Sequence, residues 1–445
     1  MNQVKKFGKP ALVLLAIICI SLIGSRAMAD MLTDEISAAL DSHPEIASLK
    51  FGAAAAQKQI KQAYSLYLPS LDARAAAGRE NIDNPSTQAR LDGDDNLGPT
   101  ELSITLRQNI FEGFGTRSAV ESAAAGHQAA TMSVLDGGER VGLQAVQAYI
   151  NLLRYQKLVG LAKRNLDTHK GLLRLIQQRV RQKVGSASEI NQTMARIKEA
   201  EAEVYQAQGG LENARSVYKT VMGADPAETL EEPDIPIPAS AAGLDELIDE
   251  GVKENPVILR AQVQVERAEA EARRLKAAFW PTLDLELTAN HDNDLSGTPG
   301  RYEGYKAMTV MTYNIYSGGL DQSRKREALL LVRQAKSDLE FAKRTVTEQI
   351  RVSHNDLRVS RLRLKSFQAQ VKENKRVQKA FADQFKVGKR TLLDLLDTQR
   401  ELFRSESNVV SEGHEEMFGI YRLIVAQGRL LNTLGISAPK GVEGE

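Results

Sequence analysis

Four short stretches of the chain alternate apolar and polar residues with a period of two. About ten residues of such alternation, with one apolar and one polar face, are typical of an outer-membrane barrel strand, but taken alone they favour a half-buried strand in a soluble sheet. Polar loops at 81–100 and 292–304 separate the members of each pair, so we expect two β-hairpins. The fourth stretch is less regular but rich in β-forming residues. The stretches are 71–78, 102–110, 283–290 and 305–316.

Most of the remaining chain is predicted to form very long helices. No proline occurs from Thr116 to Gln182, and apolar residues recur there every seven positions. Seven-residue periodicity predicts helices that supercoil against their neighbours, and about 67 residues at 1.5 Å each reach ~100 Å. An ordinary helical bundle does not need that length. The heptad positions are Leu152, Val159, Leu166, Leu173 and Val180, and then Ile350, Leu357, Leu364 and Val371.

Each long helical stretch is interrupted by a Val–Gly pair, at Val184–Gly185 and at Val387–Gly388. A serine or threonine follows each pair before the next helical stretch. Glycine just past a helix end and Ser or Thr before the next helix predict a C-cap followed by an N-cap. We therefore expect these residues to form the tips of two helical hairpins.

The same landmarks occur twice, in the same order. This recurrence predicts two structural repeats, 30–230 and 241–436, joined by a proline-rich linker at 231–240 and followed by a tail at 437–445. The recurring segments are 43–46 and 255–258, 68–72 and 280–284, and 109–113 and 314–318.

The first 29 residues resemble an export signal. A basic start, the apolar stretch 11–23 and the small residues around Ala29 give the pattern of a cleaved leader. The alternative, a transmembrane anchor, needs more than about 13 apolar residues. The single cysteine, Cys19, lies inside this segment, so we expect a mature chain with no lipid and no disulfide.

Charge and hydropathy narrow the classes of partner. The chain has 58 Lys and Arg against 57 Asp and Glu, and removal of the leader leaves a net charge of −3. The sequence has no excess of basic residues that would indicate a nucleic-acid partner. Beyond the leader, no stretch approaches the ~20 apolar residues of a spanning helix, so entry into a membrane requires strands.

The number of strands predicts the assembly. Backbone polar groups in lipid must all be paired, so membrane strands close into a barrel, and the smallest such barrels have eight strands. Two chains give eight strands with an interior filled by side chains, whereas three chains give twelve and leave room for a lumen. We therefore predict a mainly α protein with membrane β structure. In this prediction, a trimeric twelve-stranded β-barrel continues into a long periplasmic α-helical barrel. Trp280 and Tyr67, where helix gives way to strand, are expected at the membrane interface.

The duplicated helix–proline–strand unit, the Asn-Ile-aromatic-x-Gly strand ends and the Val–Gly tips together resemble the TolC family of outer-membrane ducts. The resemblance covers essentially the whole mature chain. It implies a homotrimer in the outer membrane, extending into the periplasm and opened by an inner-membrane pump and a periplasmic adaptor (membrane fusion) protein. The hairpin tips are then the adaptor contacts.

Within that family, the segment 387–397 with Arg400, Glu401, Leu402 and Phe403 resembles the type I secretion branch. This resemblance implies an exit duct for an inner-membrane ABC exporter, with large repeat-rich secreted proteins as cargo. One alternative is a duct for drug or metal efflux. Another, of a different class, is a periplasmic coiled-coil scaffold without a pore.

The candidate chemistry lies just after the second tip. Asp394 and Asp397 are three residues apart and so share a helix face, and they match the family's acidic constriction. In a trimer, six carboxylates in a narrow throat select cations and raise one another's pKa. The residues alone favour a solvated helix face, whereas the family resemblance favours the constriction. Arg390 is expected to bridge to a neighbouring helix and hold the throat shut. Phe385 and Asn191 occupy positions where some members have a Tyr–Asp hydrogen bond, which phenylalanine cannot form.

The sequence does not indicate an enzyme. It contains no cysteine nucleophile outside the leader, no phosphate loop and no nucleophile elbow, so we expect no catalysis and no cofactor. The histidines are scattered without metal-ligand spacing, so we expect no metal. They are His43, His127, His169, His291, His354 and His414.

Overall fold

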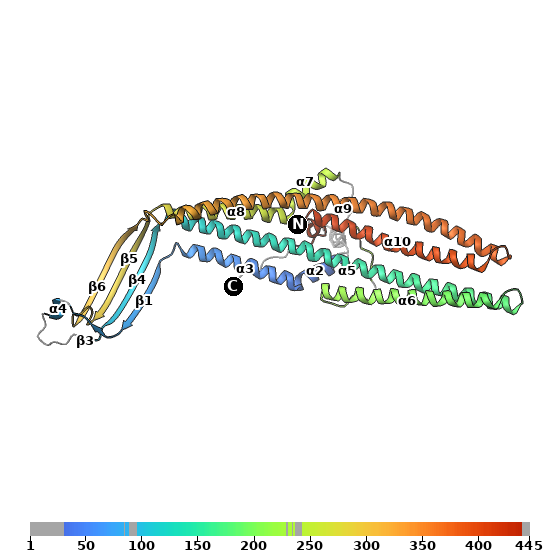
Figure 1. Ribbon diagram of the computed structural model, residues 1–445, viewed down its shortest axis with the longest axis horizontal. Helices are drawn as coiled ribbons and strands as arrows, with labels where there is room; N and C mark the ends of the chain where they lie inside the picture. Colours follow the sequence, from blue (N-terminus) through green and yellow to red (C-terminus); the bar gives the residue numbers. More distant parts are fainter. Residues whose placement is uncertain are drawn as a thin grey trace, which may run out of the picture.

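The computed structural model describes residues 31–83, 85–88, 96–227, 230–233, 235 and 243–437. The described chain forms a long rod with a β-sheet at one end and the turns of two helical hairpins at the other (Figure 1). The leader expected at 1–29 lies outside the described residues, as do most of the expected linker and all but the first residue of the expected tail.

Four strands form one antiparallel sheet in the order β1-β4-β5-β6. The expected strands are confirmed, but the last one begins and ends four residues earlier than predicted. Its final residue, Thr312, pairs with Thr282, the first residue of β5. Pro281, which precedes Thr282 in the chain, has no N–H to donate, so the hydrogen bonds between β5 and β6 end there. The bounds are β1 Ser70–Ala77, β4 Thr100–Phe111, β5 Thr282–Asn293 and β6 Arg301–Thr312.

The strand register separates an apolar from a polar face. Leu106 lies opposite Leu71 on one side and Leu287 on the other, which continues one apolar row across three strands. One position along, Arg107 donates to Asp284 at 3.0 Å on the other face. The period-two alternation is therefore a real division between faces.

The described part of the segment between β1 and β4 contains secondary structure that was not predicted. Its short strands β2 (Glu80–Asn81) and β3 (Asn96–Leu97) pair with each other, and α4 (Pro85–Gln88) lies between them in the chain.

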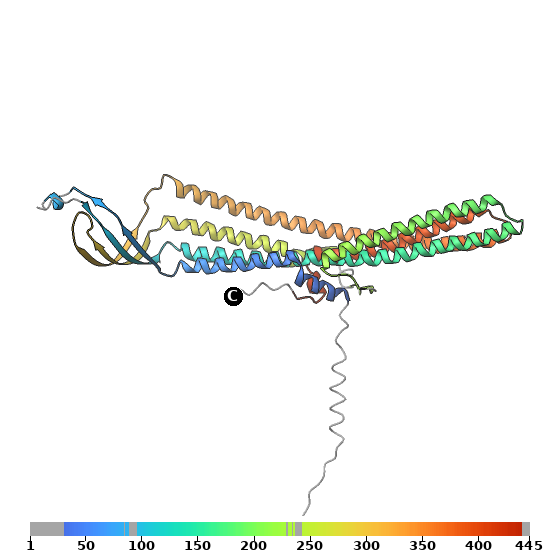
Figure 2. The same ribbon diagram turned by 90° about the horizontal axis from the view of Figure 1, so that it is seen from below.

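Each strand of the large sheet connects with one helix. The pairs are α3 with β1, β4 with α5, α8 with β5 and β6 with α9, and the 3₁₀ helix η2 (Ala277–Phe279) lies between α8 and β5. α3 contacts α5, α5 contacts α8, and α8 contacts α9, so the helices follow the order of the strands (Figure 2). The helix bounds are α3 Pro44–Ser65, α5 Gly115–Arg181, α8 Pro256–Lys276 and α9 Leu320–Lys386.

The two longest helices confirm the predicted length. α5 and α9 each have 67 residues, and α5 lies one residue from the expected position. Two of their heptad residues, Leu152 and Ile350, are fully buried against neighbouring helices. α6 (Ala187–Met222) returns along α5 and α10 (Leu392–Ala426) along α9, and α10 also packs on α5.

The main core lies around the middle of the rod. There the short helices α2 (Met31–Ser42), α7 (Leu244–Glu254) and α11 (Leu430–Thr433) pack against the long ones, and Tyr149 and Tyr421 are fully buried. Among the described helices, none combines the length and apolar character that crossing a membrane would need.

Candidate channel constriction

The two hairpin turns have the same backbone geometry but place their Val–Gly pairs differently. Lys183 (φ 60°) and Gly388 (φ 75°) are the left-handed residues that reverse the chain. The next residue donates its N–H five positions back in both turns, from Val184 to Arg179 and from Lys389 to Gln384, each at 2.9 Å. The prediction that glycine makes both turns is therefore wrong for the first. Gly185 lies after the left-handed position, which a lysine occupies.

The predicted N-caps are confirmed. Ser186 precedes α6 and donates its N–H to the carboxylate of Glu189 at 3.1 Å. Thr391 precedes α10, where its hydroxyl oxygen accepts the N–H of Asp394 at 3.2 Å. The Asp394 carboxylate in turn accepts the N–H of Thr391 at 3.1 Å. Asp394 thus forms half of a reciprocal capping box.

This cap favours the ionised form of Asp394. Hydrogen bonds from the hydroxyl and the N–H of Thr391, with the nearby Arg390, hold the pKa of Asp394 below its ordinary value. The sequence argument expected neighbouring carboxylates to raise this pKa, and within one chain the shift has the opposite sign. Asp394 is therefore ionised at neutral pH.

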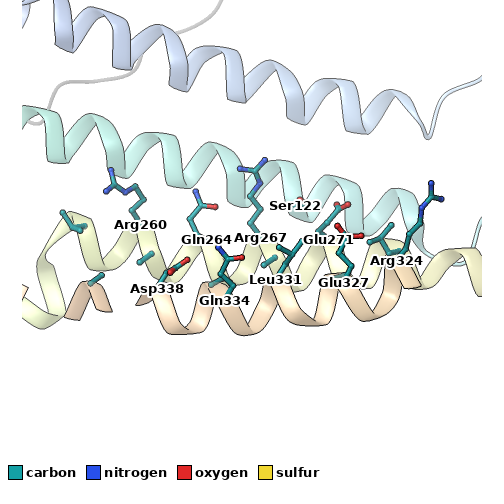
Figure 3. Close-up of a pocket in the computed structure, with 17 residues that line it drawn as sticks. Ser122, Arg260, Gln264, Arg267, Glu271, Arg324, Glu327, Leu331, Gln334 and Asp338 are labelled. Atoms are coloured by element: carbon teal, nitrogen blue, oxygen red, sulfur yellow. The ribbon is translucent and has the colours of Figure 1, made fainter. Parts of the chain in front are cut away.

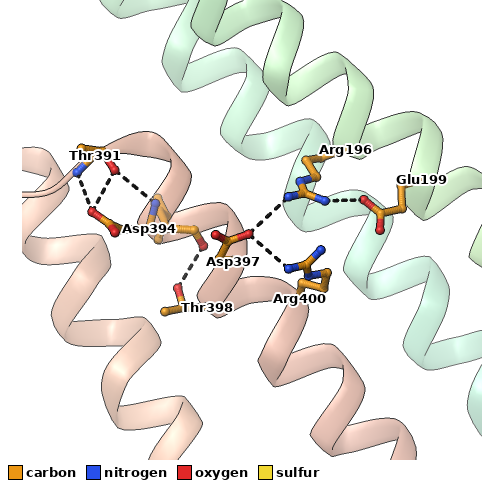
Figure 4. A network of polar contacts seen from close by, with 8 residues as sticks. Arg196, Glu199, Thr391, Asp394, Asp397, Thr398 and Arg400 are labelled. Atoms are coloured by element: carbon orange, nitrogen blue, oxygen red, sulfur yellow. Dashed lines mark hydrogen bonds and ion pairs between the residues drawn. The ribbon is translucent and has the colours of Figure 1, made fainter.

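Asp397 points toward another helix. One of its carboxylate oxygens accepts from Arg196 of α6 at 3.2 Å and lies 3.5 Å from a guanidinium nitrogen of Arg400. Arg196 also donates to Glu199 at 2.7 Å. Figure 4 shows the two carboxylates diverging, Asp394 toward its cap and Asp397 toward α6. Arg196 was missed by sequence reasoning, because nothing in the pattern of α6 signals a partner 201 residues away.

Arg390 reaches across the turn to its own hairpin partner, α9. Its guanidinium donates to the side-chain oxygen of Gln384 at 3.2 Å and lies 4.2 Å from the ring centroid of Phe381. Its distance to the Asp394 carboxylate is 4.0 Å. Within one chain, Arg390 therefore stabilises the second hairpin.

Phe385 and Asn191 have different surroundings. Phe385 is buried in an apolar cluster with Ile176 of α5 and Leu396 of α10, and the Arg179 guanidinium lies 4.7 Å from its ring centroid. Asn191 is exposed on α6. Phe385, which has no hydroxyl group for a hydrogen bond, instead takes part in apolar packing between the two hairpins.

Further from the hairpin turns than this cluster, a series of hydrogen-bonded amide and carboxylate side chains crosses all four helices of the hairpins. Gln378 of α9 donates to Gln399 of α10 at 3.3 Å, and Gln399 donates to the buried Asn165 of α5 at 3.3 Å. Asn165 donates in turn to Glu203 of α6 at 3.0 Å. The two hairpins are therefore joined by apolar contacts near the tips and by polar contacts further from the tips.

Aromatic residues lie where helix meets strand. Trp280 and Tyr67 are each about half exposed, and Trp280 packs edge-on against Phe111 with ring centroids 6.4 Å apart. A Cβ at Gly113 would lie 2.6 Å from the Cβ of Trp280, so glycine permits this close approach. The junction therefore places exposed aromatic surface directly beside the sheet.

A groove of about 770 Å³ runs between α8 and α9 on the side of the rod nearer the sheet. α8 contributes Arg260, Gln264 and Arg267 to its lining, and α9 contributes Gln334 and Asp338 (Figure 3). Within the described ranges, no group of three or more His, Cys, Asp or Glu side chains could hold a metal ion. The groove is a feature of the wall and lies apart from the hairpin tips.

The strand–helix architecture is that of an outer-membrane channel that extends into the periplasm, and not that of an enzyme. The chain belongs to the family described as outer membrane efflux protein, whose family model matches residues 36–224 and 247–411. The resemblance to the TolC family is thereby confirmed.

Individual relatives and structures agree with this family. The outer membrane efflux protein BepC of Brucella suis is 24% identical over 419 residues, covering 92% of this chain and 88% of BepC. The outer membrane protein TolC of Escherichia coli is 24% identical over 441 residues, covering 95% and 87%. The structure of the outer membrane protein VceC from Vibrio cholerae matches with a TM-score of 0.76 at 17% identity, covering 90% and 96%, and thus shows the shared fold.

Proposed function

We propose that three copies of this chain close one twelve-stranded barrel that continues into an α-helical tube. This proposal is supported by the matching order of strands and helices: the strands lie in the order β1-β4-β5-β6, and the helices connected to them lie in the order α3-α5-α8-α9. The outer strands β1 and β6 leave one edge each to be paired, and a membrane allows no unpaired edge. Pairing β1 of one copy with β6 of the next satisfies both edges.

Exposed apolar side chains on the outer helices support the same closure. Phe51 of α3 is 64% exposed, and Leu330 and Phe341 of α9 are 61% and 71% exposed. Large apolar side chains on one helix face mark a surface that another protein surface covers. In the trimer, α9 of one copy packs against α3 of the next.

The equal lengths of the long helices support an internal duplication with repeats 30–230 and 241–436, the linker 231–240 and the tail 437–445. α5 and α9 have 67 residues each, and α6 and α10 have 36 and 35. Each repeat then supplies two strands and one long hairpin.

In the proposed trimer, Asp394 and Asp397 form the channel constriction near the closed end of the tube. Arg390, Phe385 and Asn191 are its gate contacts. Ionised Asp394 supports cation selection, because rings of carboxylates attract cations in a narrow aqueous throat.

The two ends of the tube have different partners. Val184, Gly185, Val387 and Gly388 lie at or beside the turns and are the proposed contacts of the periplasmic adaptor. The half-exposed Trp280 and Tyr67 lie beside the sheet, and we assign them to the interface with outer-membrane lipid.

For the transported substrate, we propose the exit duct of a type I secretion system with an inner-membrane ABC exporter, an adaptor and large repeat-rich protein cargo. The segment 387–397 supports this choice. So does the similarity to the alkaline protease secretion protein AprF of Pseudomonas aeruginosa, 24% identical over 318 residues.

Efflux of metals or drugs is the second candidate. The cobalt-zinc-cadmium resistance protein CzcC of Cupriavidus metallidurans is 25% identical over 312 residues and favours it. The scaffold without a pore has no such support, because the family consists of channels.

Deletion of the gene, with analysis of the culture medium and of growth on metals and drugs, distinguishes the two candidates. A type I duct predicts that one or a few large proteins disappear from the medium while tolerance of metals and drugs is unchanged. Lost tolerance with an unchanged set of secreted proteins would contradict the secretion assignment and favour efflux.

A further inference from the structure

The contacts of Arg196 make the two constriction carboxylates unequal. Asp397 lies within 3.5 Å of two guanidinium groups, those of Arg196 and Arg400. The cation paired with Asp394 is Arg390, at 4.0 Å, and that guanidinium also lies against the Phe381 ring. Guanidinium groups therefore lie closer to Asp397 than to Asp394.

The position of Arg196 is fixed by its surroundings. Its side chain is only 23% exposed, and one of its terminal nitrogens donates to Glu199 while the other donates to Asp397. The buried His169 of α5 lies close by, and burial together with the charge of Arg196 lowers the pKa of His169. Because His169 stays neutral, it does not compete with Arg196 for the carboxylates. The guanidinium of Arg196 is thus held between the carboxylates of Glu199 and Asp397.

We propose that Arg196 is a specificity-determining residue that compensates Asp397, so that the cation site of the constriction is formed by Asp394. This inference rests on the proposed channel function, and it differs from the sequence-based expectation, in which the carboxylates of both residues select cations. It assigns Asp397 to holding α10 against α6 and Asp394 to attracting the ion.

The inference is tested by block of the single-channel current by Mg²⁺ in a planar bilayer. A divalent ion about 6 Å from one unit charge in water-like surroundings changes its binding about tenfold. Asp394→Asn should therefore weaken block about tenfold, whereas Asp397→Asn should change it less than about twofold. Arg196→Gln should strengthen block by up to about tenfold, because it removes one of the two guanidinium groups beside Asp397 and leaves Arg400. Lys198→Gln is the matched control, since Lys198 lies on the same helix and pairs with Glu201 instead.

Two further variants separate charge from misfolding. Adding Asp397→Asn to Arg196→Gln should restore block to the wild-type level. If Arg196→Gln fails to assemble, the comparison of Asp394→Asn with Asp397→Asn still decides.

Equal weakening by Asp394→Asn and Asp397→Asn would overturn the inference and leave the channel intact. A trimer that passes no current in any variant would overturn the proposed channel function itself, and the inference with it.

Discussion

Glu139 shows how one buried residue links distant parts of the chain. Its carboxylate lies on α5 and accepts the N–H groups of Leu430 at 2.8 Å and Leu431 at 3.0 Å, at the start of α11. Burial is the largest cause that raises the pKa of Glu139, to about 7, and the nearby Asp136 adds to it. The folded protein therefore holds a proton between pH 4.5 and 7 that the unfolded chain has lost.

This pKa predicts a pH-dependent stability. The contribution of Glu139 is fully present below pH 4.5 and is lost as pH rises through about 7. The loss is on the order of 3 kcal/mol per chain. Glu139→Gln should flatten the fall in the unfolding midpoint between pH 5 and pH 8, measured in detergent. The same substitution at the exposed Glu415 should leave the slope unchanged, and an unchanged slope in Glu139→Gln would contradict the assignment.

Single residues are also where sequence reasoning reached its limit. The spacing of Asp394 and Asp397 placed both after the second tip, but it could not show that one is a helix cap and the other an ion-pair partner. Those roles depend on Thr391, close in the chain, and on Arg196, which is near only in the folded chain. Local spacing carries the first kind of contact and not the second.

Secondary-structure elements were predicted well where the signal repeats along the chain. The lack of proline and the heptad spacing predicted both ends of α5 to within one residue, and the period-two alternation predicted the apolar and polar faces of the sheet. The end of β6 was missed because it depends on its partner, where Pro281 interrupts the ladder. The first tip was misread because Lys183 adopts the conformation that glycine normally supplies.

The two turns give a matched prediction. Gly388→Ala should favour local opening of the second turn by about 1–2 kcal/mol, because φ is 75° and open space surrounds the position. Lys183→Gly should stabilise the first turn by up to about 1 kcal/mol. Amide hydrogen exchange of the turn residues measures both effects. Gly209→Ala, in α6 with open space around it, is the control and should stabilise its helix. Slower exchange in Gly388→Ala would contradict the backbone argument.

The whole molecule has two edges that one chain leaves incomplete. The outer strands of the sheet and the exposed faces of α3 and α9 lie on those edges, and the proposed trimer would satisfy both at once. The sequence could predict this closure only through the number of strands, because contacts between copies leave no pattern within one chain.

A charge on the exposed face of α9 should prevent assembly. Phe341→Asp places a carboxylate where the proposed trimer would bury an aromatic ring, and an unpaired buried charge costs several kcal/mol. We expect monomers in native mass spectrometry of the detergent-solubilised variant. Phe341→Leu keeps the apolar surface and should remain trimeric. A trimer of Phe341→Asp with wild-type stability would exclude this face from the interface.

The most direct test of the channel is the single-channel current of the purified wild-type trimer, compared with that of the Asp394→Ala/Asp397→Ala variant. The proposed structure predicts a small cation-selective current in the wild type, and a larger current with weaker divalent block in the variant. A confirmed trimer that carries no current would contradict the channel. An unchanged current in the variant would place the constriction elsewhere along the tube.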